Sequence, residues 1–454
     1  MVLSSFLFDR QDAADRAKDQ TLEILDDLFA GYTEPRLTVR LWDGTTWPDK
    51  VVVSPAFTLV LDHPGALRQM LLPPSELNLG ESYIYGDYDV EGDLTAAFPL
   101  ASYFEGIDLG LGDKLGLAWK LRSLPKTAAP REGRQAARMS GVPHSRQRDR
   151  EAISYHYDVS NDFYALWLDR RMVYSCGYFA DPGDDIHTAQ ERKLDYTCRK
   201  LRLKPGERVL DIGCGWGGLV IHAAQHFGVE ALGITLSQPQ VDFARERIAE
   251  AGIADRCRVE YLDYREITPS SMPGQGPFDK LVSVGMFEHV GEVKMRTYFE
   301  QARDLLRPGG VFLNHAIARP GWQPNGDSGA FSDRGDTFSD RYVFPDGELT
   351  PISHSLRIAE EVGFEVRDVE SLREHYALTL RRWVRRLEQR HEQALQHVDE
   401  VTYRIWRLFM SGSADGFESG RLNVYQSLLV KPDARGQSGL PLTRADLYAD
   451  RRTA

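Results

Sequence analysis

Residues 208–218 read Arg-Val-Leu-Asp-Ile-Gly-Cys-Gly-Trp-Gly-Gly. The apolar run from Val209 to Ile212 is typical of a buried strand, and the glycines after it predict a tight turn. Apolar residues then recur with helical spacing from Leu219 to Phe227, so the stretch predicts a strand, a turn and the start of a helix. Four glycines within six positions let a nucleotide-like ligand lie directly against the backbone, where a Cβ atom would collide.

The glycine spacing by itself fits two kinds of cofactor. Three of the glycines satisfy the G-x-G-x-x-G fingerprint of dinucleotide sites, which also need an acidic residue about 20 positions further on. The predicted second strand ends instead in the uncharged Thr235 and Gln240. Asp211, just before the turn, suits a cationic cofactor better than an anionic pyrophosphate. The residues therefore favour S-adenosylmethionine, and a nicotinamide cofactor is the alternative.

Predicted strands and helices alternate from residue 145 to residue 431. This alternation predicts an α/β fold with a Rossmann-like, mostly parallel sheet of seven strands covered on both faces. A cofactor is expected outside the carboxyl ends of the strands, at the switch point of the sheet. We expect strands near 208–212, 229–235, 256–261, 279–284, 310–317, 364–369 and 421–430, and helices near 217–227, 238–251, 292–306, 353–362 and 376–412.

The first 125 residues have a pattern of their own. Short apolar runs at 37–41, 51–53 and 57–61 are separated by turn residues, which predicts strands of a second, smaller α+β domain. A basic stretch rich in Ala, Gly and Pro follows and is typical of a linker. The expected organisation is an N-terminal domain at 1–125, a linker at 126–145, a catalytic domain at 146–432 and a tail at 433–454.

The charge of the chain is unevenly distributed. The formal net charge is −12, which taken alone disfavours an anionic partner. Between Lys114 and Arg150, however, there are ten Lys or Arg and two carboxylates, a net charge of +8 that leaves −20 for the rest. A solvated linker is the plainer explanation; the alternative is an interfacial helix at 109–124 attracted to anionic phospholipid head groups. Aromatic residues do not interleave with the basic ones, so we expect no nucleic-acid partner.

Length and composition set further expectations. With 454 residues, 42% of them hydrophobic, the chain can form the cores of two or three domains. It contains no run of 18 apolar residues and begins with no basic and apolar leader, so we expect neither a membrane span nor a secretory signal. Four cysteines without C-x-x-C spacing fit a reduced cytoplasm and predict no metal site.

Several further motifs share their order with one known family. The glycine turn is followed by Gly-Ile-Thr-Leu-Ser-x-x-Gln at 233–240. Together with the other motifs it resembles the cyclopropane-fatty-acyl-phospholipid synthase family and the related mycolic acid methyltransferases, over about residues 80 to 430. The remaining matches are His-Tyr-Asp-Val-Ser-Asn-Asp-Phe-Tyr at 156–164, Val-Tyr-Ser-Cys-Gly-Tyr-Phe at 173–179, Ser-Val-Gly-Met-Phe-Glu-His-Val-Gly at 283–291, Tyr-Val-Phe-Pro-Asp-Gly-Glu-Leu at 342–349 and His-Tyr-Ala-Leu-Thr-Leu at 375–380.

The resemblance implies a class I S-adenosylmethionine-dependent methyltransferase that acts on the cis double bond of unsaturated acyl chains in membrane phospholipids. A carbocation on the acyl chain would lose a proton to a bound bicarbonate and close a cyclopropane. The alternative product from the same methyl transfer is a methylene or methyl-branched chain. Residues 78–90 are similar to the N-terminal region of bacterial cyclopropane synthases, which implies a lipid-binding accessory domain. Contact with the inner face of the cell membrane and a homodimer are expected by the same analogy.

The resemblance also implies the site residues. The family's bicarbonate ligands correspond to the backbone of Cys176 and Ile317 and to the side chains of Glu288, His315 and Tyr376. From the residues alone, Glu288 also fits a helix-start acid, His315 a structural strand histidine and Tyr376 a core tyrosine. The residues expected at the cofactor are Tyr157, Tyr174, Ser175, Asp211, Gly213, Gly215, Gly217, Thr235, Gln240, Asp263 and Tyr264.

The chain departs from the family pattern at Glu151, where relatives more often have a basic or polar residue. A carboxylate there would be a second candidate base, replacing or supplementing bicarbonate. A function of another class, a lipid and cofactor binder without catalysis, is also considered. The presence of Glu288, His315 and Tyr376 argues against it, because a binder needs no base.

Overall fold

The computed structural model describes residues 2–32, 37–48, 55–100, 103, 110–157, 159–268, 276–321 and 337–448. The chain forms two compact units. The first unit comprises residues 1–136, 329–342 and 399–415, and the second comprises 137–328, 343–398 and 416–454. Two segments expected within 146–432 therefore belong to the first unit by their contacts, and the domain limits read from the sequence stay predictions.

The first unit is built on a four-stranded sheet of order β2-β1-β3-β4. The expected strands at 37–41 and 57–61 are β1 (Leu37–Arg40) and β3 (Phe57–Leu61), which pair in parallel. Alternate residues of β3 are buried, which is the pattern of a sheet with one face on a core. The strand expected at 51–53 lies outside the described residues. The sequence analysis missed β2 (Thr46–Trp47), β4 (Tyr88–Gly92) and the helix α1 (Val2–Phe29).

The later segments join the first unit through polar contacts. In α16 (Glu400–Ser419), Arg404 forms an ion pair with Asp89 of β4 at 2.9 Å. Arg407 donates to the hydroxyl of Tyr83 in α3 (Glu76–Ile84) at 2.7 Å. Within the described ranges, no helix is long and apolar enough to cross a bilayer. The other helices of this unit are α2 (Ala66–Leu71), η1 (Leu94–Ala97), α5 (Leu111–Ser123) and α12 (Phe338–Tyr342).

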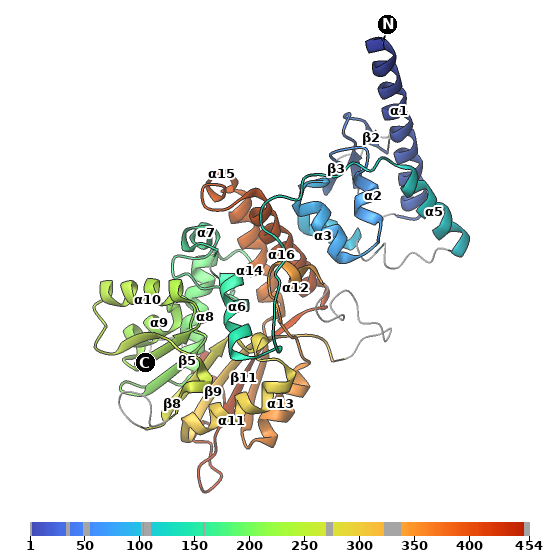
Figure 1. Ribbon diagram of the computed structural model, residues 1–454. Helices are drawn as coiled ribbons and strands as arrows, with labels where there is room; N and C mark the ends of the chain where they lie inside the picture. Colours follow the sequence, from blue (N-terminus) through green and yellow to red (C-terminus); the bar gives the residue numbers. More distant parts are fainter. Residues whose placement is uncertain are drawn as a thin grey trace. The chain divides into compact units, whose positions relative to one another are not determined.

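The second unit contains the expected seven-stranded sheet, of order β10-β11-β9-β8-β5-β6-β7 (Figure 1). Only β11 runs antiparallel to its neighbours. The chain winds outward from β5 to β7 on one side and from β8 on the other, so the switch point lies between β5 and β8. The predicted α/β fold is confirmed. The strands are β5 (Arg208–Ile212), β6 (Glu230–Thr235), β7 (Cys257–Tyr261), β8 (Phe278–Val284), β9 (Leu306–Ala318), β10 (Glu365–Ser371) and β11 (Asn423–Val430).

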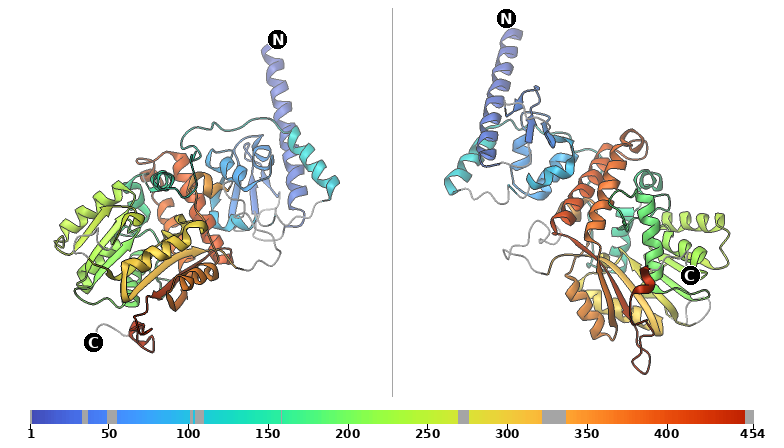
Figure 2. Two further views of the ribbon diagram at one scale, coloured as in Figure 1. Left: turned by 60° about the horizontal axis from the view of Figure 1, so that its bottom comes forward. Right: turned by 180° about the vertical axis from the view of Figure 1, so that it is seen from behind.

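Helices cover both faces of this sheet (Figures 1 and 2). One face carries α8 (Ile186–Leu201), α9 (Gly218–Phe227) and α10 (Gln238–Glu250) over a core that includes Val209. The other carries α11 (Met295–Leu305) and α13 (Ile352–Glu361) over a core that includes Leu210. Adjacent residues of one strand thus enter opposite cores, which explains why the central strands are continuous apolar runs.

The helix expected over 376–412 is wrong as a single element. The structure has α14 (Arg373–Glu388), the short α15 (His391–Ala394) and then α16. The side chain of Asp399 accepts a hydrogen bond from the backbone N–H of Thr402 at 2.7 Å, so it caps a new helix rather than continuing the old one. The remaining elements of the second unit are α6 (Arg146–Tyr157), α7 (Asn161–Trp167), η2 (Tyr264–Glu266), η3 (Phe287–His289), η4 (Glu292–Lys294) and α17 (Ala445–Tyr448).

Candidate active site

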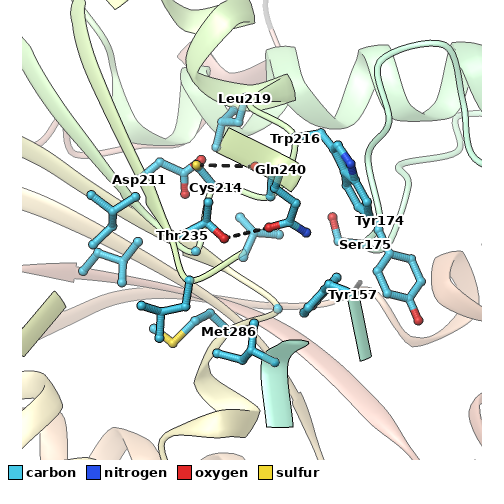
Figure 3. A pocket seen from close by; sticks show the side chains of 18 of the residues that line it. Tyr157, Tyr174, Ser175, Asp211, Cys214, Trp216, Leu219, Thr235, Gln240 and Met286 are labelled. Atoms are coloured by element: carbon cyan, nitrogen blue, oxygen red, sulfur yellow. Dashed lines mark hydrogen bonds between the residues drawn. The ribbon is translucent and has the colours of Figure 1, made fainter. Parts of the chain in front are cut away.

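A pocket lies at the carboxyl ends of β5, β6 and β8, beside the switch point of the sheet (Figure 3). Its empty volume is about 1130 Å³, part of which is open to the solvent. All but one of the residues expected at a cofactor line it: Tyr157, Tyr174, Ser175, Asp211, Gly213, Gly215, Thr235, Gln240, Asp263 and Tyr264. The exception, Gly217, is the N-cap of α9, next to the lining residue Gly218.

The glycine turn needs glycine for two separate reasons. Gly213, Gly215 and Gly217 have φ values of 83°, 54° and 80°, in the left-handed region that side chains disfavour. A Cβ atom on Gly213 would also lie 2.7 Å from Cβ of Met286. At Gly215, by contrast, an added Cβ would meet nothing within 4 Å. The backbone at Gly215 thus faces open space in the pocket, where a ligand can approach it closely.

Asp211 is a buried carboxylate at the centre of this pocket. It is 2% exposed, and its Oδ1 has no hydrogen-bond partner among the described residues. Burial raises the pKa of Asp211 to about 7, while the charge of Lys193 lowers it. A cationic group of a bound ligand would satisfy this carboxylate, as expected for a sulfonium donor with an amino group.

At the end of β6 the structure has an uncharged pair where a dinucleotide site needs an acid. The hydroxyl of Thr235 donates to Oε1 of Gln240 at 2.7 Å, and both side chains are buried. The amide nitrogen of Gln240 is left to face a ligand. This arrangement provides hydrogen bonds without a charge.

The wall near Asp263 and Tyr264 contains residues that the sequence analysis missed. Arg265 donates to Oδ1 of Asp263 at 2.8 Å and forms an ion pair with Asp149 at 2.9 Å. Although burial opposes it, hydrogen bonding from Arg265 lowers the pKa of Asp263. Asp149 and Arg265 also line the pocket. No sequence signal pairs them, because they lie far apart in the chain.

A second polar cluster lies next to the pocket. Glu288 is in η3, between Met286 and His289, which both line the pocket. Its Oε1 accepts the backbone N–H of Ile317 at 2.7 Å, and its Oε2 has no partner in the described part of the chain. Burial raises the pKa of Glu288 to about 7. Burial raises the pKa of the hydroxyls of Tyr157 and Tyr376, and the charge of Glu288 raises it further.

His315 lies on β9, two residues before Ile317, the residue whose backbone N–H donates to Glu288. It is 2% exposed, and burial lowers its pKa to about 3, so the ring is neutral. Its Nδ1 lies 3.2 Å from the amide nitrogen of Gln426, and its Nε2 has no partner among the residues that the structure describes. Nε2 of His315 and Oε2 of Glu288 are therefore two buried polar atoms without a partner in the described ranges.

Cys176, near Tyr376, is a protonated thiol and does not act as a nucleophile. It is fully buried, and burial raises its pKa. Its Sγ donates to the carbonyl oxygen of Leu372 at 3.6 Å, and the same oxygen accepts the backbone N–H of Tyr376 at 3.0 Å. Burial of the hydroxyl also raises the pKa of Tyr376. A protonated thiol and phenol lining the site fit a positioning role.

Glu151 lies apart from these groups. Its side chain is exposed on α6, and its Oε1 accepts a hydrogen bond from Gln147 at 3.0 Å. Asp149, Ile153 and Tyr157 of the same helix line the pocket, and Glu151 does not. The structure thus links Glu288 to Ile317, and Cys176 to Tyr376 through the carbonyl oxygen of Leu372. Glu151 takes part in neither set of contacts, and its role as a base stays a prediction.

The fold and the pocket define a class I S-adenosylmethionine-dependent methyltransferase. Residues 144–427 match the family described as mycolic acid cyclopropane synthetase, and the chain belongs to this family. It is 40% identical to a "Probable fatty acid methyltransferase" of Pseudomonas putida over 418 residues, which are 91% of this chain and 96% of that protein. It is 34% identical to the "Tuberculostearic acid methyltransferase UfaA1" of Mycobacterium tuberculosis, over 82% of this chain and 83% of that one.

The chain is also similar to solved structures of the same family. The cyclopropane synthase MmaA2 from Mycobacterium tuberculosis is 30% identical, with a TM-score of 0.57, and the match covers 62% of this chain and 97% of that one. The mycolic acid cyclopropane synthase CmaA1, complexed with SAH and CTAB, is 32% identical, with a TM-score of 0.57 and the same two coverages. S-adenosylmethionine is therefore the cofactor of this enzyme family, and the alternative of a nicotinamide cofactor is rejected.

Proposed function

We propose that this enzyme transfers the methyl group of S-adenosylmethionine to the cis double bond of an unsaturated acyl chain in a membrane phospholipid. The observation that carries the proposal is the cluster of Glu288 and His315, buried beside the donor pocket with two polar atoms unpaired. A bound donor would satisfy the unpaired carboxylate of Asp211, which lines the pocket, but Glu288 and His315 are outside the pocket lining and would stay unpaired, at a cost to the fold.

The proposed chemistry begins with an electron pair of the alkene. That pair forms a bond to the sulfonium methyl carbon, the carbon–sulfur bond breaks, and its electrons leave with S-adenosylhomocysteine. The acyl chain then carries a cation. Loss of a proton from the new methyl group closes a cyclopropane. Alternatively, a hydride shift moves the cation to the carbon that bears the methyl group, and loss of a proton from that methyl group gives a methylene branch. Both routes need a base and a site that excludes water.

The residues around Glu288 fit such a base site. His315 is neutral, so its Nε2 can hold a polar oxygen without adding positive charge beside the cation. Tyr376 and the backbone near Cys176 and Ile317 offer further polar contacts. A bicarbonate held there would supply an anionic oxygen that accepts the proton. The unpaired atoms of Glu288 and His315 are compatible with a small polar group of this kind.

The names of the relatives bear on the product. The two relatives cited above that align with more than 80% of this chain are named as methyltransferases. The two solved structures, which cover 62% of this chain, are named as cyclopropane synthases. The sequence motifs predict the cyclopropane as the first candidate product. The names of the full-length relatives favour the methylene or methyl-branched chain as a second candidate.

The test is the lipid composition of a host that expresses the chain. Proton NMR and mass spectrometry of extracted phospholipids would show high-field cyclopropane protons for the first product and vinylidene protons for the second. Unchanged lipids, together with intact S-adenosylhomocysteine binding, would support the non-catalytic binder instead. The variant Glu151→Gln distinguishes between the two candidate bases, bicarbonate and Glu151. Loss of product with cofactor binding retained would assign proton removal to Glu151.

We also propose that the first unit contacts an anionic membrane surface through α5. Leu111, Leu115 and Trp119 are spaced by four residues on this helix and are 82%, 70% and 70% exposed. Lys120 is turned toward α1, where it pairs with Asp27 at 2.6 Å. An exposed apolar ridge with basic neighbours fits the boundary between head groups and acyl chains. The neighbouring exposed basic residues of the described part are Lys114, Arg122 and Lys126.

Vesicle sedimentation tests this contact. Wild-type protein should bind phosphatidylcholine vesicles only when they contain phosphatidylglycerol, and Leu115→Gln combined with Trp119→Gln should abolish binding. Leu442→Gln is the matched control, because Leu442 is fully exposed in the second unit. Equal binding by both variants would exclude α5. The homodimer stays a prediction, and sedimentation velocity on the same samples would test it.

A further inference from the structure

Three polar side chains lie in a row across neighbouring strands of the seven-stranded sheet. Glu370 of β10 is directly opposite Gln426 of β11, and Gln426 is directly opposite His315 of β9. Directly opposite residues of antiparallel strands point to the same face, with Cβ atoms about 4.5–5.5 Å apart. This is the face that α8 covers, since Leu313, two positions before His315, shares a core with Leu201 of α8. Gln426 therefore stands between the carboxylate of Glu370 and the imidazole of His315.

The orientation of the Gln426 amide decides which nitrogen of His315 carries the ring proton. The amide nitrogen lies 3.2 Å from Nδ1 of His315, and the amide oxygen has no partner among the described residues. In this orientation the amide donates to Nδ1, so the proton of the neutral ring is on Nε2. A half-turn of the amide would exchange its nitrogen and oxygen. The ring would then donate from Nδ1 to the amide oxygen, and Nε2 would have no proton.

An unpaired carboxylate at Glu370 would favour that half-turn. A carboxylate only accepts hydrogen bonds, so it attracts the nitrogen end of a neighbouring amide dipole and repels the oxygen end. In the described structure, Glu370 instead forms an ion pair with Lys200 of α8. Lys200 also lies 3.9 Å from Asp368, whose carboxylate accepts a hydrogen bond from Arg444 at 2.7 Å.

Lys200 is a fully buried cation, which is costly for a lysine unless a partner compensates its charge. Burial lowers the pKa of Lys200, and the charge of Glu370 raises it. Burial also lowers the pKa of His315, and the charges of Lys193 and Lys200 lower it further, so the ring stays neutral. The other titratable groups on which the charge of Glu370 acts are Tyr178, Tyr196 and His375.

We infer that Lys200 is a positioning residue for His315. By pairing with the carboxylate of Glu370, it allows the amide of Gln426 to keep its nitrogen toward Nδ1, and the ring proton stays on Nε2. The importance of this proton for turnover rests on the proposed function of His315, whereas the position of the proton can be measured without turnover.

Nitrogen NMR of the full-length protein with isotope-labelled histidine tests the inference. Long-range proton–nitrogen correlation distinguishes a protonated ring nitrogen from a bare one, and His315→Gln identifies the signals of His315. Wild-type protein should carry the proton on Nε2. Lys200→Met keeps the length of the side chain and removes its charge, so the proton should move to Nδ1 in most molecules. Wild-type protein with the proton on Nδ1, or Lys200→Met with the proton still on Nε2, would overturn the inference.

A second substitution distinguishes positioning from a merely structural ion pair. Adding Glu370→Leu to Lys200→Met removes the carboxylate too and should return the proton to Nε2; a proton left on Nδ1 would overturn the inference. Lys280→Met is the matched control and should keep the proton on Nε2, because Lys280 is a second buried lysine, 6% exposed, that pairs with Glu207 at 3.8 Å. Lys200→Gln, which can still donate to Glu370, serves with the same expectation if Lys200→Met does not fold.

Methyl transfer by the same variants tests the proposed function separately. Where the proton moves to Nδ1, the single-turnover rate should fall about 10-fold, the cost of one lost buried hydrogen bond. The affinity for S-adenosylhomocysteine should stay unchanged, because Lys200 does not line the donor pocket. A moved proton with an unaltered rate would support the inference and contradict the proposed role of His315.

Discussion

Gln426 on β11 and His315 on β9 are paired directly across two neighbouring strands, with the Gln426 amide nitrogen 3.2 Å from Nδ1 of His315. Both side chains are buried. An amide nitrogen can only donate, so Nδ1 accepts and the ring proton of neutral His315 lies on Nε2. Nε2 is the atom of His315 that has no partner among the described residues. Gln426 thus determines that this unpaired atom is a donor.

The first prediction follows from this pair. Gln426→Leu leaves the tautomer of His315 unspecified, and we expect the rate of methyl transfer to fall about 10-fold or more, the cost of one lost buried hydrogen bond. The affinity for S-adenosylhomocysteine should stay unchanged, because Gln426 does not line the cofactor pocket. Single-turnover kinetics and calorimetry measure the two quantities. An unaltered rate would show that the tautomer is irrelevant.

The second prediction concerns the base site. Glu288→Gln keeps the shape of the side chain and its contact with Ile317 but removes the negative charge, and we expect a fall in turnover of about 10²- to 10⁴-fold. Binding of S-adenosylhomocysteine should persist. Glu300→Gln is the control, because Glu300 is exposed on α11. Should both variants retain full turnover, Glu288 has no part in proton removal.

The third prediction compares three glycines. Gly215→Ala should weaken S-adenosylhomocysteine binding more than it weakens folding, since its Cβ would occupy open pocket space. Gly213→Ala should lower the melting temperature most, because its Cβ would collide with Met286. Gly436→Ala controls for backbone strain alone, with a φ of 75° and nothing within 4 Å of its Cβ. The strain itself costs about 1–2 kcal/mol. Thermal unfolding of the three variants with and without ligand ranks their melting temperatures and their ligand binding. Equal ligand binding by the Gly213 and Gly215 variants would contradict the prediction.

The fourth prediction is a pH dependence of stability. Burial lowers the pKa of His289 to about 4 from 6.5, so between these values the unfolded chain binds a proton that the folded chain does not. The free energy of unfolding therefore decreases as the pH falls from 6.5 toward 4, by up to about 1.4 kcal/mol per pH unit for this histidine. His289→Gln should lose less stability over this range in urea unfolding. Parallel pH profiles for the two proteins would refute the assignment.

Local sequence patterns predicted the second unit well. All seven strands overlap the ranges expected from the sequence, although β7 and the edge strand β10 mix apolar and charged residues. The glycine turn was predictable because its conformation excludes side chains. The break before α16 was not predictable from the sequence. Asp399 fits the helical pattern around it, and only its hydrogen bond to Thr402 shows that it begins a new helix.

The sequence by itself determined the parallel sheet, the position of the pocket and the uncharged pair of Thr235 and Gln240 at the end of β6, since each depends on neighbouring residues. The tertiary structure decided which distant side chains meet. Lys193 reaches Ser175 from another element, and Gln426 meets His315 across two strands. Such contacts depend on how helices and strands pack, and no short-range pattern in a single sequence encodes them.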